Sequence, residues 1–206
     1  GQFCTNPGLV LAVKSDALDN FIEEAGKALK EVPANTMLTP GIHAAYEQSV
    51  AKLAGNPKVN EVSRGLTGDG ENQCQAGLFT TQGADLLADE SLQEEVFGAS
   101  SLVVVCNDLD EMKRVAEALE GQLTATLQMD EGDTQDAAKL LPVLERKAGR
   151  IMANGWPTGV EVCHAMVHGG PFPSTSDSRT TSVGSAAIYR FLRPVCYQNL
   201  SDALLP

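Results

Sequence analysis

The stretch "SLVVVCNDLDEMKRVAEALEGQLTATLQM" (residues 101–129) decides the fold class of this chain. It begins with a continuous apolar, β-branched run at residues 101–106, which is typical of a strand buried on both faces. Residues 108–121 follow with apolar side chains at helical spacing, acidic residues in the first turn and Gly121 at the end. Residues 122–129 alternate apolar and polar side chains as a strand does. The stretch therefore predicts a β-α-β unit.

The same pattern extends on both sides of this unit. "TQDAAKLLPVLERKAG" (134–149) predicts a helix and "GRIMANG" (149–155) predicts a further strand. Such crossovers normally build a parallel sheet with helices on its faces. Further upstream, residues 41–55 predict a helix, and residues 58–65 and 74–83 predict strands or extended segments. We therefore predict an α/β fold with a parallel-type sheet and flanking helices.

Residues 15–32 predict the first long helix, with Ser15 as its N-cap. Its apolar face is expected to contain Leu18, Phe21, Ile22, Ala25 and Leu29.

The C-terminal quarter has a different character. Residues 155–184 are rich in Gly, Pro, Ser and Thr, and irregular stretches of this length tend to be functional. Residues 186–200 predict an extended strand interrupted by Pro194, which suggests an edge or a strand that leaves the domain to pair elsewhere. We predict a catalytic domain at residues 1–185 and a projecting tail at 186–206.

Charge and cysteine content exclude several function classes. The chain has a net charge of −12, which disfavours binding to nucleic acids and to anionic membrane surfaces. Its apolar runs fall short of the roughly 18 residues that a membrane span requires, so we expect no membrane association. The five cysteines include no C-x-x-C pair, which favours a reducing, cytoplasmic compartment.

Cys4 is the first candidate for chemistry. It lies among small and turn-forming residues in "GQFCTNPG" (1–8), where a thiol can be exposed and approached closely by a substrate. The alternative is an incidental thiol near the terminus. A stand-alone thiol hydrolase is a further hypothesis, in which Cys4 works with His43, His164 or His168.

Other groups give weaker signals. Four acidic residues precede the buried strand: Asp89, Glu90, Glu94 and Glu95. They either form a solvated loop or bind ribose hydroxyls at a carboxyl or crossover edge of the sheet. "CHAMVH" (163–168) has two histidines four residues apart, but its flanking residues disfavour a helix and we predict no metal site. We find no glycine-rich phosphate-binding motif in the chain.

Five segments in this order resemble the C-terminal catalytic half of the aldehyde dehydrogenase family. They are "GQFC" (1–4), "EEVFG" (94–98), "GQLTATLQMDE" (121–131), "AGRIMANG" (148–155) and "GGPFP" (169–173). The resemblance implies that Cys4 is the nucleophile, that Glu95 contacts the nicotinamide ribose and that Phe97 lies beside the nicotinamide ring. It also implies that Phe172 belongs to a loop walling the substrate pocket and that the strand at 186–199 serves oligomerisation.

Two departures from the family pattern narrow this resemblance. Ala99 stands where the family has a proline, and "PSTSDSRTTSVG" (173–184) replaces a basic, glycine-rich stretch. The second change resembles the branch that handles α-ketoglutarate semialdehyde and, in some members, fatty aldehydes, often with NADP. The resemblance thus implies NADP or NAD as cofactor, a small-molecule aldehyde as substrate and a homo-oligomer.

The implied mechanism is covalent. The Cys4 thiolate forms a thiohemiacetal whose oxyanion is held by the Cys4 backbone N–H and by an asparagine, hydride passes to the nicotinamide, and a thioester is hydrolysed. In the family the coenzyme-binding domain, the asparagine and a glutamate general base lie upstream of the cysteine. We therefore expect that the 206-residue chain alone does not oxidise aldehydes. The hydrolase, or a non-catalytic assembly domain that adds its tail to a partner's sheet, is the alternative.

Overall fold

A computed structural model of the chain describes residues 2–157 and 159–206. The helices are α1 (Asp16–Lys30), α2 (Pro40–Ala54), α3 (Gly83–Ala88), α4 (Leu109–Ala118) and α5 (Thr134–Lys147), with 3₁₀ turns η1 (Glu90–Gln93), η2 (Glu131–Asp133), η3 (Ser185–Phe191) and η4 (Asp202–Leu204). The strands are β1 (Leu9–Val13), β2 (Asn35–Thr36), β3 (Asn60–Arg64), β4 (Gln73–Cys74), β5 (Gly77–Gln82), β6 (Ser100–Cys106), β7 (Gln122–Leu127) and β8 (Ala148–Ala153).

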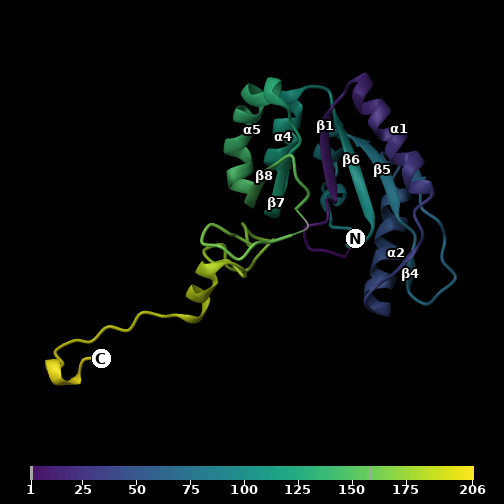
Figure 1. The fold of residues 1–206 in the computed structure, drawn as a ribbon. Helices are drawn as coiled ribbons and strands as arrows, with labels where there is room; N and C mark the ends of the chain where they lie inside the picture. The colour runs from purple at the N-terminus through teal and green to yellow at the C-terminus, as the bar shows by residue number, and fades with distance from the viewer. Residues whose placement is uncertain (1, 158) are drawn as a thin grey trace.

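The main sheet has four strands in the order β1-β6-β5-β3 (Figure 1). Strand β6 runs parallel to both β1 and β5, whereas β3 pairs with β5 in the antiparallel sense. The apolar run at residues 101–106 therefore lies inside the sheet, and its Val103 and Val104 are fully buried. The prediction of an α/β fold with a parallel-type sheet and flanking helices is confirmed.

The strands of the β-α-β-α-β series do not all join one sheet, which differs from the simplest expectation. Strands β7 and β8 form a parallel pair of their own beside the main sheet. Both edges of β6 are already occupied, because β1 pairs with one and β5 with the other. Strand β1, which the sequence analysis did not identify, thus takes the place next to β6 that β7 would otherwise fill.

Helix α1 begins as predicted, since the Ser15 hydroxyl accepts a hydrogen bond from the Leu18 backbone N–H at 3.2 Å. Leu18 is buried, but Phe21 is 49% exposed, so its assignment to the buried face is wrong. The helix covers β3 and β5, and only a narrow stripe of its surface faces them.

The core forms where side chains of α2, α3 and α4 pack together with those of β5 and β6. Its largest fully buried side chains, Tyr46, Phe79, Leu86, Val103, Val104, Val115 and Val143, come from helices on both sides of the chain's midpoint and from strands β5 and β6. Tyr46 on α2 is 1% exposed, which matters for the site described below.

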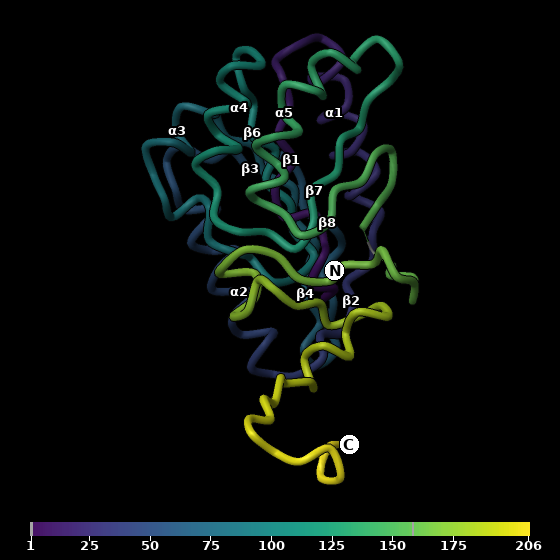
Figure 2. Tube along the Cα trace, turned by 90° about the vertical axis from the view of Figure 1, so that its left-hand side faces the viewer, coloured from purple at the N-terminus to yellow at the C-terminus, as the bar shows by residue number. Residues whose placement is uncertain are grey.

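The C-terminal tail projects away from the body, as both views show (Figures 1 and 2). The predicted strand at 186–200 is wrong for this structure: η3 covers Ser185–Phe191, and residues 192–201 form no helix or strand. A strand needs a neighbouring strand to satisfy its backbone groups, and this tail pairs with none of the described strands. The irregular character predicted for residues 155–184 is confirmed for the described part of that stretch.

Candidate active site

The candidate site residues gather at the amino edge of the main sheet. Strands β1 and β6 are parallel neighbours with Leu9 opposite Leu102, so the segments that precede them, 2–8 and 94–99, lie next to each other. Cys4 belongs to the first segment and Glu95 to the second. The predicted carboxyl or crossover edge for the acidic segment is wrong, because the register of the sheet places the segment at the amino edge.

A cavity of about 770 Å³ lies at this edge and is lined by both segments. Cys4, Glu95 and Phe97 all line it, although more than 90 residues separate the first of them from the other two. The start of β7 at Gln122 lines it as well, as does Ser174 in the loop near the C-terminus. The structure therefore brings together three of the four residues that the sequence analysis selected.

The segment that carries Cys4 is held in place on several sides. The Gln2 side-chain oxygen accepts a hydrogen bond from the Leu38 N–H at 2.7 Å, and the Gly8 carbonyl accepts one from the Leu102 N–H at 2.9 Å. Thr5 is buried, and its hydroxyl donates a hydrogen bond to the Pro157 carbonyl. Cys4 itself is exposed. Its thiol is thus accessible on a backbone that the surrounding fold restrains.

The other four cysteines are poorer candidates for a nucleophile at this site. Cys74 and Cys106 are buried. Burial, with a further contribution from Glu111, raises the pKa of the Cys106 thiol to about 11, which keeps it protonated and unreactive at neutral pH. Cys163 and Cys196 are exposed, but they do not line the cavity.

His168 is the one of the three candidate histidines that approaches Cys4. Its Nε2 lies 3.4 Å from the Cys4 Sγ, a hydrogen-bond contact across 164 residues of sequence. His43 instead contacts the Gln73 carbonyl through Nε2 at 3.2 Å, and His164 is exposed on the surface. A neutral imidazole nitrogen at this distance can accept the proton of the thiol as the sulfur attacks an electrophile.

The Ser- and Thr-rich stretch at 173–184 holds His168 by its backbone. The Thr181 hydroxyl accepts a hydrogen bond from the His168 N–H at 2.8 Å, and the Ser182 hydroxyl donates one to the His168 carbonyl at 3.0 Å. Thr181 is 5% exposed, so this support is buried. The imidazole Nδ1 is buried and has no hydrogen-bond partner among the described residues. The composition of the stretch marks it as unusual, but no local pattern indicates that Thr181 and Ser182 hold His168.

The acidic residues before β6 differ in their bonding partners. Asp89 caps η1: hydrogen bonds from Ser91 and Asn56 lower the pKa of its carboxyl. Glu94 forms an ion pair with Lys52 at 2.6 Å. Glu95 lines the cavity, as Glu94 does, but none of the ion pairs among the described residues involves Glu95. Its carboxylate is therefore available to a ligand.

The two phenylalanines selected from the sequence have different positions. Phe97 is half-buried and lines the cavity. Phe172 is 79% exposed and lies outside the cavity lining, while the residues after it, Pro173 and Ser174, are part of that lining. The Phe172 carbonyl accepts a hydrogen bond from the Gly121 N–H at 3.3 Å, which ties its loop to the start of β7. The role of Phe172 in the substrate pocket stays a prediction.

Metal-binding groups and membrane-spanning helices also bear on function. Within residues 2–157 and 159–206, no group of three or more His, Cys, Asp and Glu side chains is placed to hold a metal ion. None of the helices in the described part of the chain is both long enough and apolar enough to cross a membrane.

Comparison with protein families gives one match that spans most of the chain. Residues 1–192 match the profile of the aldehyde dehydrogenase family. This match includes every residue assigned above to the cavity and to its immediate support.

Comparison with individual proteins includes two related dehydrogenases among its matches. The chain is 58% identical over its full length to "Alpha-ketoglutaric semialdehyde dehydrogenase 2" of Azospirillum brasilense. It is 47% identical over its full length to "Alpha-ketoglutaric semialdehyde dehydrogenase" of Acinetobacter baylyi. The chain spans 39% of the length of each of these relatives.

Comparison with solved structures supports the fold. The structure of lactaldehyde dehydrogenase from Escherichia coli superposes with a TM-score of 0.73 at 18% sequence identity. The similarity covers 94% of this chain and 40% of that one.

Proposed function

The chain belongs to the aldehyde dehydrogenase family, and from that premise we propose that it forms the catalytic part of a longer enzyme that oxidises an aldehyde to a carboxylic acid with NADP or NAD. The observation that carries the proposal is the single cavity lined by Cys4, Glu95 and Phe97. We propose α-ketoglutarate semialdehyde as the aldehyde, because two relatives of high identity bear that substrate in their names.

In this proposal Cys4 is the nucleophile. Its sulfur bonds to the aldehyde carbon, the thiol proton passes to Nε2 of His168, 3.4 Å away, and the carbonyl oxygen becomes an oxyanion. The family resemblance assigns stabilisation of that oxyanion to the Cys4 backbone N–H. The restraint of this loop by Thr5 and Gly8 favours a fixed direction of attack, which hydride transfer requires.

Glu95 and Phe97 form the dinucleotide side of the proposed site. A bound nicotinamide dinucleotide supplies the acceptor for the hydride that leaves the aldehyde carbon. The unpaired carboxylate of Glu95 would accept hydrogen bonds from ribose hydroxyls, and the Phe97 ring would flank the nicotinamide. Once the hydride has left, the substrate carbon is a thioester on Cys4, and water then releases the acid and regenerates the thiol.

The test is NAD(P)H formation by the full-length protein that contains this chain. With α-ketoglutarate semialdehyde and NADP or NAD, we expect absorbance at the wavelength of the reduced nicotinamide to rise. Glu95→Gln is expected to raise the KM for the dinucleotide about tenfold, since it weakens a charge-assisted hydrogen bond. Glu94→Gln is the matched control: Glu94 lines the same cavity, but its carboxylate is held in an ion pair with Lys52, so the substitution should change that KM little. Absence of NAD(P)H formation with every aldehyde tested contradicts the proposal.

The contact between Cys4 and His168 favours a second candidate function, a thiol hydrolase that needs no dinucleotide. In that case the chain alone should cleave an activated ester such as p-nitrophenyl acetate. His168→Gln is expected to slow cleavage about 100-fold, a usual contribution of general base catalysis, whereas His164→Gln leaves it unchanged. Ester cleavage without any NAD(P)H formation by the full-length protein would place the hydrolase ahead of the dehydrogenase.

We propose that the tail at residues 186–206 takes part in a homo-oligomer. Its large apolar side chains are exposed, with Phe191 at 85% and Tyr189 at 68%. Exposed apolar side chains on a segment that projects from the body are typical of a segment that packs on another chain. A cytoplasmic location fits the five cysteines, all of which are free thiols.

A further inference from the structure

The backbone turn at Gly98 and Ala99 connects the dinucleotide side of the proposed site to strand β6. Gly98 is buried, and a Cβ atom added to it would lie 2.1 Å from the Cδ2 atom of Tyr46. The Tyr46 ring on helix α2 therefore lies directly against the backbone of this turn, at a distance that only glycine permits. Glu95 and Phe97 stand three and one residues before it.

The Tyr46 hydroxyl reaches past Gly98 to two backbone carbonyls. It donates to the Gln75 carbonyl at 2.7 Å and also approaches the Ala99 carbonyl at 3.2 Å. Burial raises the pKa of Tyr46 well above its usual range, so the hydroxyl keeps its proton and remains a donor. Tyr46 thus connects helix α2, the segment before β5 and the segment before β6 through one oxygen atom.

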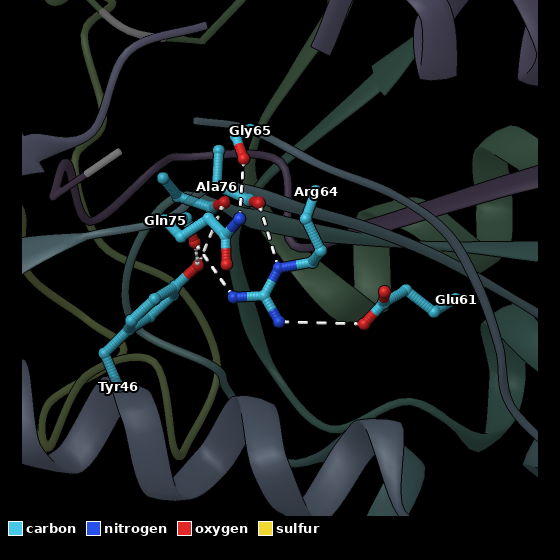
Figure 3. A network of polar contacts seen from close by, with 7 residues as sticks. Tyr46, Glu61, Arg64, Gly65, Gln75 and Ala76 are labelled. Carbon is cyan, nitrogen blue, oxygen red and sulfur yellow. Dashed lines mark hydrogen bonds and ion pairs between the residues drawn. The ribbon is translucent and has the colours of Figure 1, made fainter. Parts of the chain in front are cut away.

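The Gln75 end of this connection is itself fixed by a polar network (Figure 3). The Arg64 guanidinium donates to the Gln75 carbonyl at 3.2 Å and to the Ala76 carbonyl at 3.1 Å. The Gln75 side chain donates in turn to the Gly65 carbonyl at 2.6 Å. Tyr46 is therefore anchored to a rigid part of the sheet, and the turn at Gly98 is positioned against that anchor.

The other side of the same turn is held from the nucleophile loop. The Asn6 side-chain amide donates a hydrogen bond to the Gly98 carbonyl at 3.2 Å, and Asn6 is two residues after Cys4. The Gly98 carbonyl thus receives a hydrogen bond from the loop of Cys4, and the adjacent Ala99 carbonyl is contacted by the Tyr46 hydroxyl of α2 at 3.2 Å and by the Gly77 N–H at 2.9 Å. A shift of the turn would move the Cys4 loop together with Glu95 and Phe97.

We propose that Tyr46 is a positioning residue for the reaction. It holds the turn at Gly98–Ala99 so that Glu95 and Phe97 face the dinucleotide and, through Asn6, so that Cys4 keeps its place beside them; the proposal rests on the proposed dehydrogenase function. Ala99 lacks the ring that would fix the φ angle of a proline at this position. Its carbonyl accepts a hydrogen bond from the Gly77 N–H at 2.9 Å, and the Tyr46 hydroxyl at 3.2 Å adds a restraint from α2 to this one from the sheet.

The test compares two isosteric losses of a buried hydroxyl in the full-length protein. Tyr46→Phe removes only the hydroxyl that reaches Gln75 and Ala99. Thr81→Val is the matched control: Thr81 is 0% exposed, its hydroxyl donates to the Lys58 carbonyl at 2.9 Å, and it lies in the carboxyl half of β5, away from the cavity. Each variant loses one buried hydrogen bond, so both should lower the thermal midpoint by a few degrees.

Only Tyr46→Phe is expected to change the site. We expect it to raise the KM for the dinucleotide about fivefold while kcat stays within about a factor of two, and Thr81→Val to leave both unchanged. The rate at which iodoacetamide alkylates Cys4 is expected to change about threefold or more in Tyr46→Phe and not in Thr81→Val.

The outcomes separate this proposal from the proposed function. If wild-type protein forms no NAD(P)H, the dehydrogenase proposal fails, while the alkylation rates still test the link between Tyr46 and Cys4. If wild-type protein is active and Tyr46→Phe loses the same stability as Thr81→Val with an unchanged KM and unchanged alkylation, Tyr46 is a core residue alone and the inference is overturned.

Discussion

The amino edge of the main sheet and the C-terminal tail differ in whether their segments find bonding partners within the chain. At the edge, the short segments before β1 and β6 have irregular backbones but find partners within the chain: the Asn6 amide donates to the Gly98 carbonyl, and the Tyr46 hydroxyl contacts the Ala99 carbonyl. In the tail, an apolar segment with strand-like residues finds no partner strand, and Phe191 stays 85% exposed. The pairing of β1 with β6 brings the segments before them together as a candidate site. The tail has no paired strand, so its composition alone does not bring its residues to a site.

Removing the thiol at the edge should have the largest effect. Cys4→Ala in the full-length protein is expected to lower kcat by at least about a thousandfold, because it removes the nucleophile. Cys196→Ala, which removes an exposed thiol in the tail, should leave kcat unchanged. Steady-state NAD(P)H formation measures both, and equal effects of the two substitutions would contradict the assignment of chemistry to the edge.

Phenylalanines in the two regions should differ in their contribution to stability. Phe79 is 0% exposed, and Phe79→Ala is expected to lower the free energy of unfolding by about 3–5 kcal/mol through a lost contact surface and a cavity. Phe191→Ala in this chain should change it by less than about 0.5 kcal/mol, since the side chain is exposed. Urea denaturation followed by circular dichroism measures both values. A large decrease in the free energy of unfolding for Phe191→Ala would show that the Phe191 side chain is packed against protein and is not exposed.

Deletion of the tail should alter assembly without unfolding the body. Removal of residues 186–206 takes away exposed apolar side chains and no strand of the main sheet. In the full-length protein we expect a smaller particle by size-exclusion chromatography with light scattering, and an unchanged far-ultraviolet spectrum per residue. An unchanged particle size would remove the support for the tail as an oligomerisation segment.

Substitution of Asp89 or Asp177, two aspartates with lowered pKa values, should have a small effect on the loss of stability in acid. Hydrogen bonds from Ser91 and Asn56 lower the pKa of Asp89, and hydrogen bonds from Arg179 lower that of Asp177. Each carboxylate therefore adds stability above the ordinary pKa of an aspartate, and loses that contribution as the pH falls from about 4 through its lowered pKa. Asp89→Asn and Asp177→Asn should each flatten the acid side of the stability profile, measured as thermal midpoint against pH; a profile steeper than wild type would contradict the sign.

Most of the fold was predictable because its patterns are local. The buried run at 101–106, the helix capped by Ser15 and the order of strands and helices between residues 100 and 153 are all confirmed. Phe21 was wrongly assigned to the buried face of α1. The helix packs mainly on β3 and β5, so the part of its surface that is buried is narrower than its set of apolar side chains. Strand β1 was missed because its place beside β6 depends on a pairing across about 90 residues of sequence.

Some residues of the candidate site could be predicted from the sequence, and others needed the fold. Cys4, Glu95 and Phe97 stood out by resemblance, and the structure places all three on one cavity. The choice of His168 among three histidines needed the fold, because nothing local to "CHAMVH" indicates that Nε2 of its second histidine meets a sulfur 164 residues away. Tyr46 was given no role from the sequence, and only the 2.1 Å approach that a side chain on Gly98 would make shows its position against the site.

The central claim is that Cys4 is the residue that bonds to the substrate. The most direct measurement is mass spectrometry of peptides from the full-length protein, quenched in acid during turnover with aldehyde and NADP or NAD. The account predicts an acyl adduct on the peptide that contains Cys4, formed only when the dinucleotide is present and lost in Cys4→Ala. An adduct on the peptide of Cys163 or Cys196, or turnover without any adduct on Cys4 in a rapid quench, would contradict it.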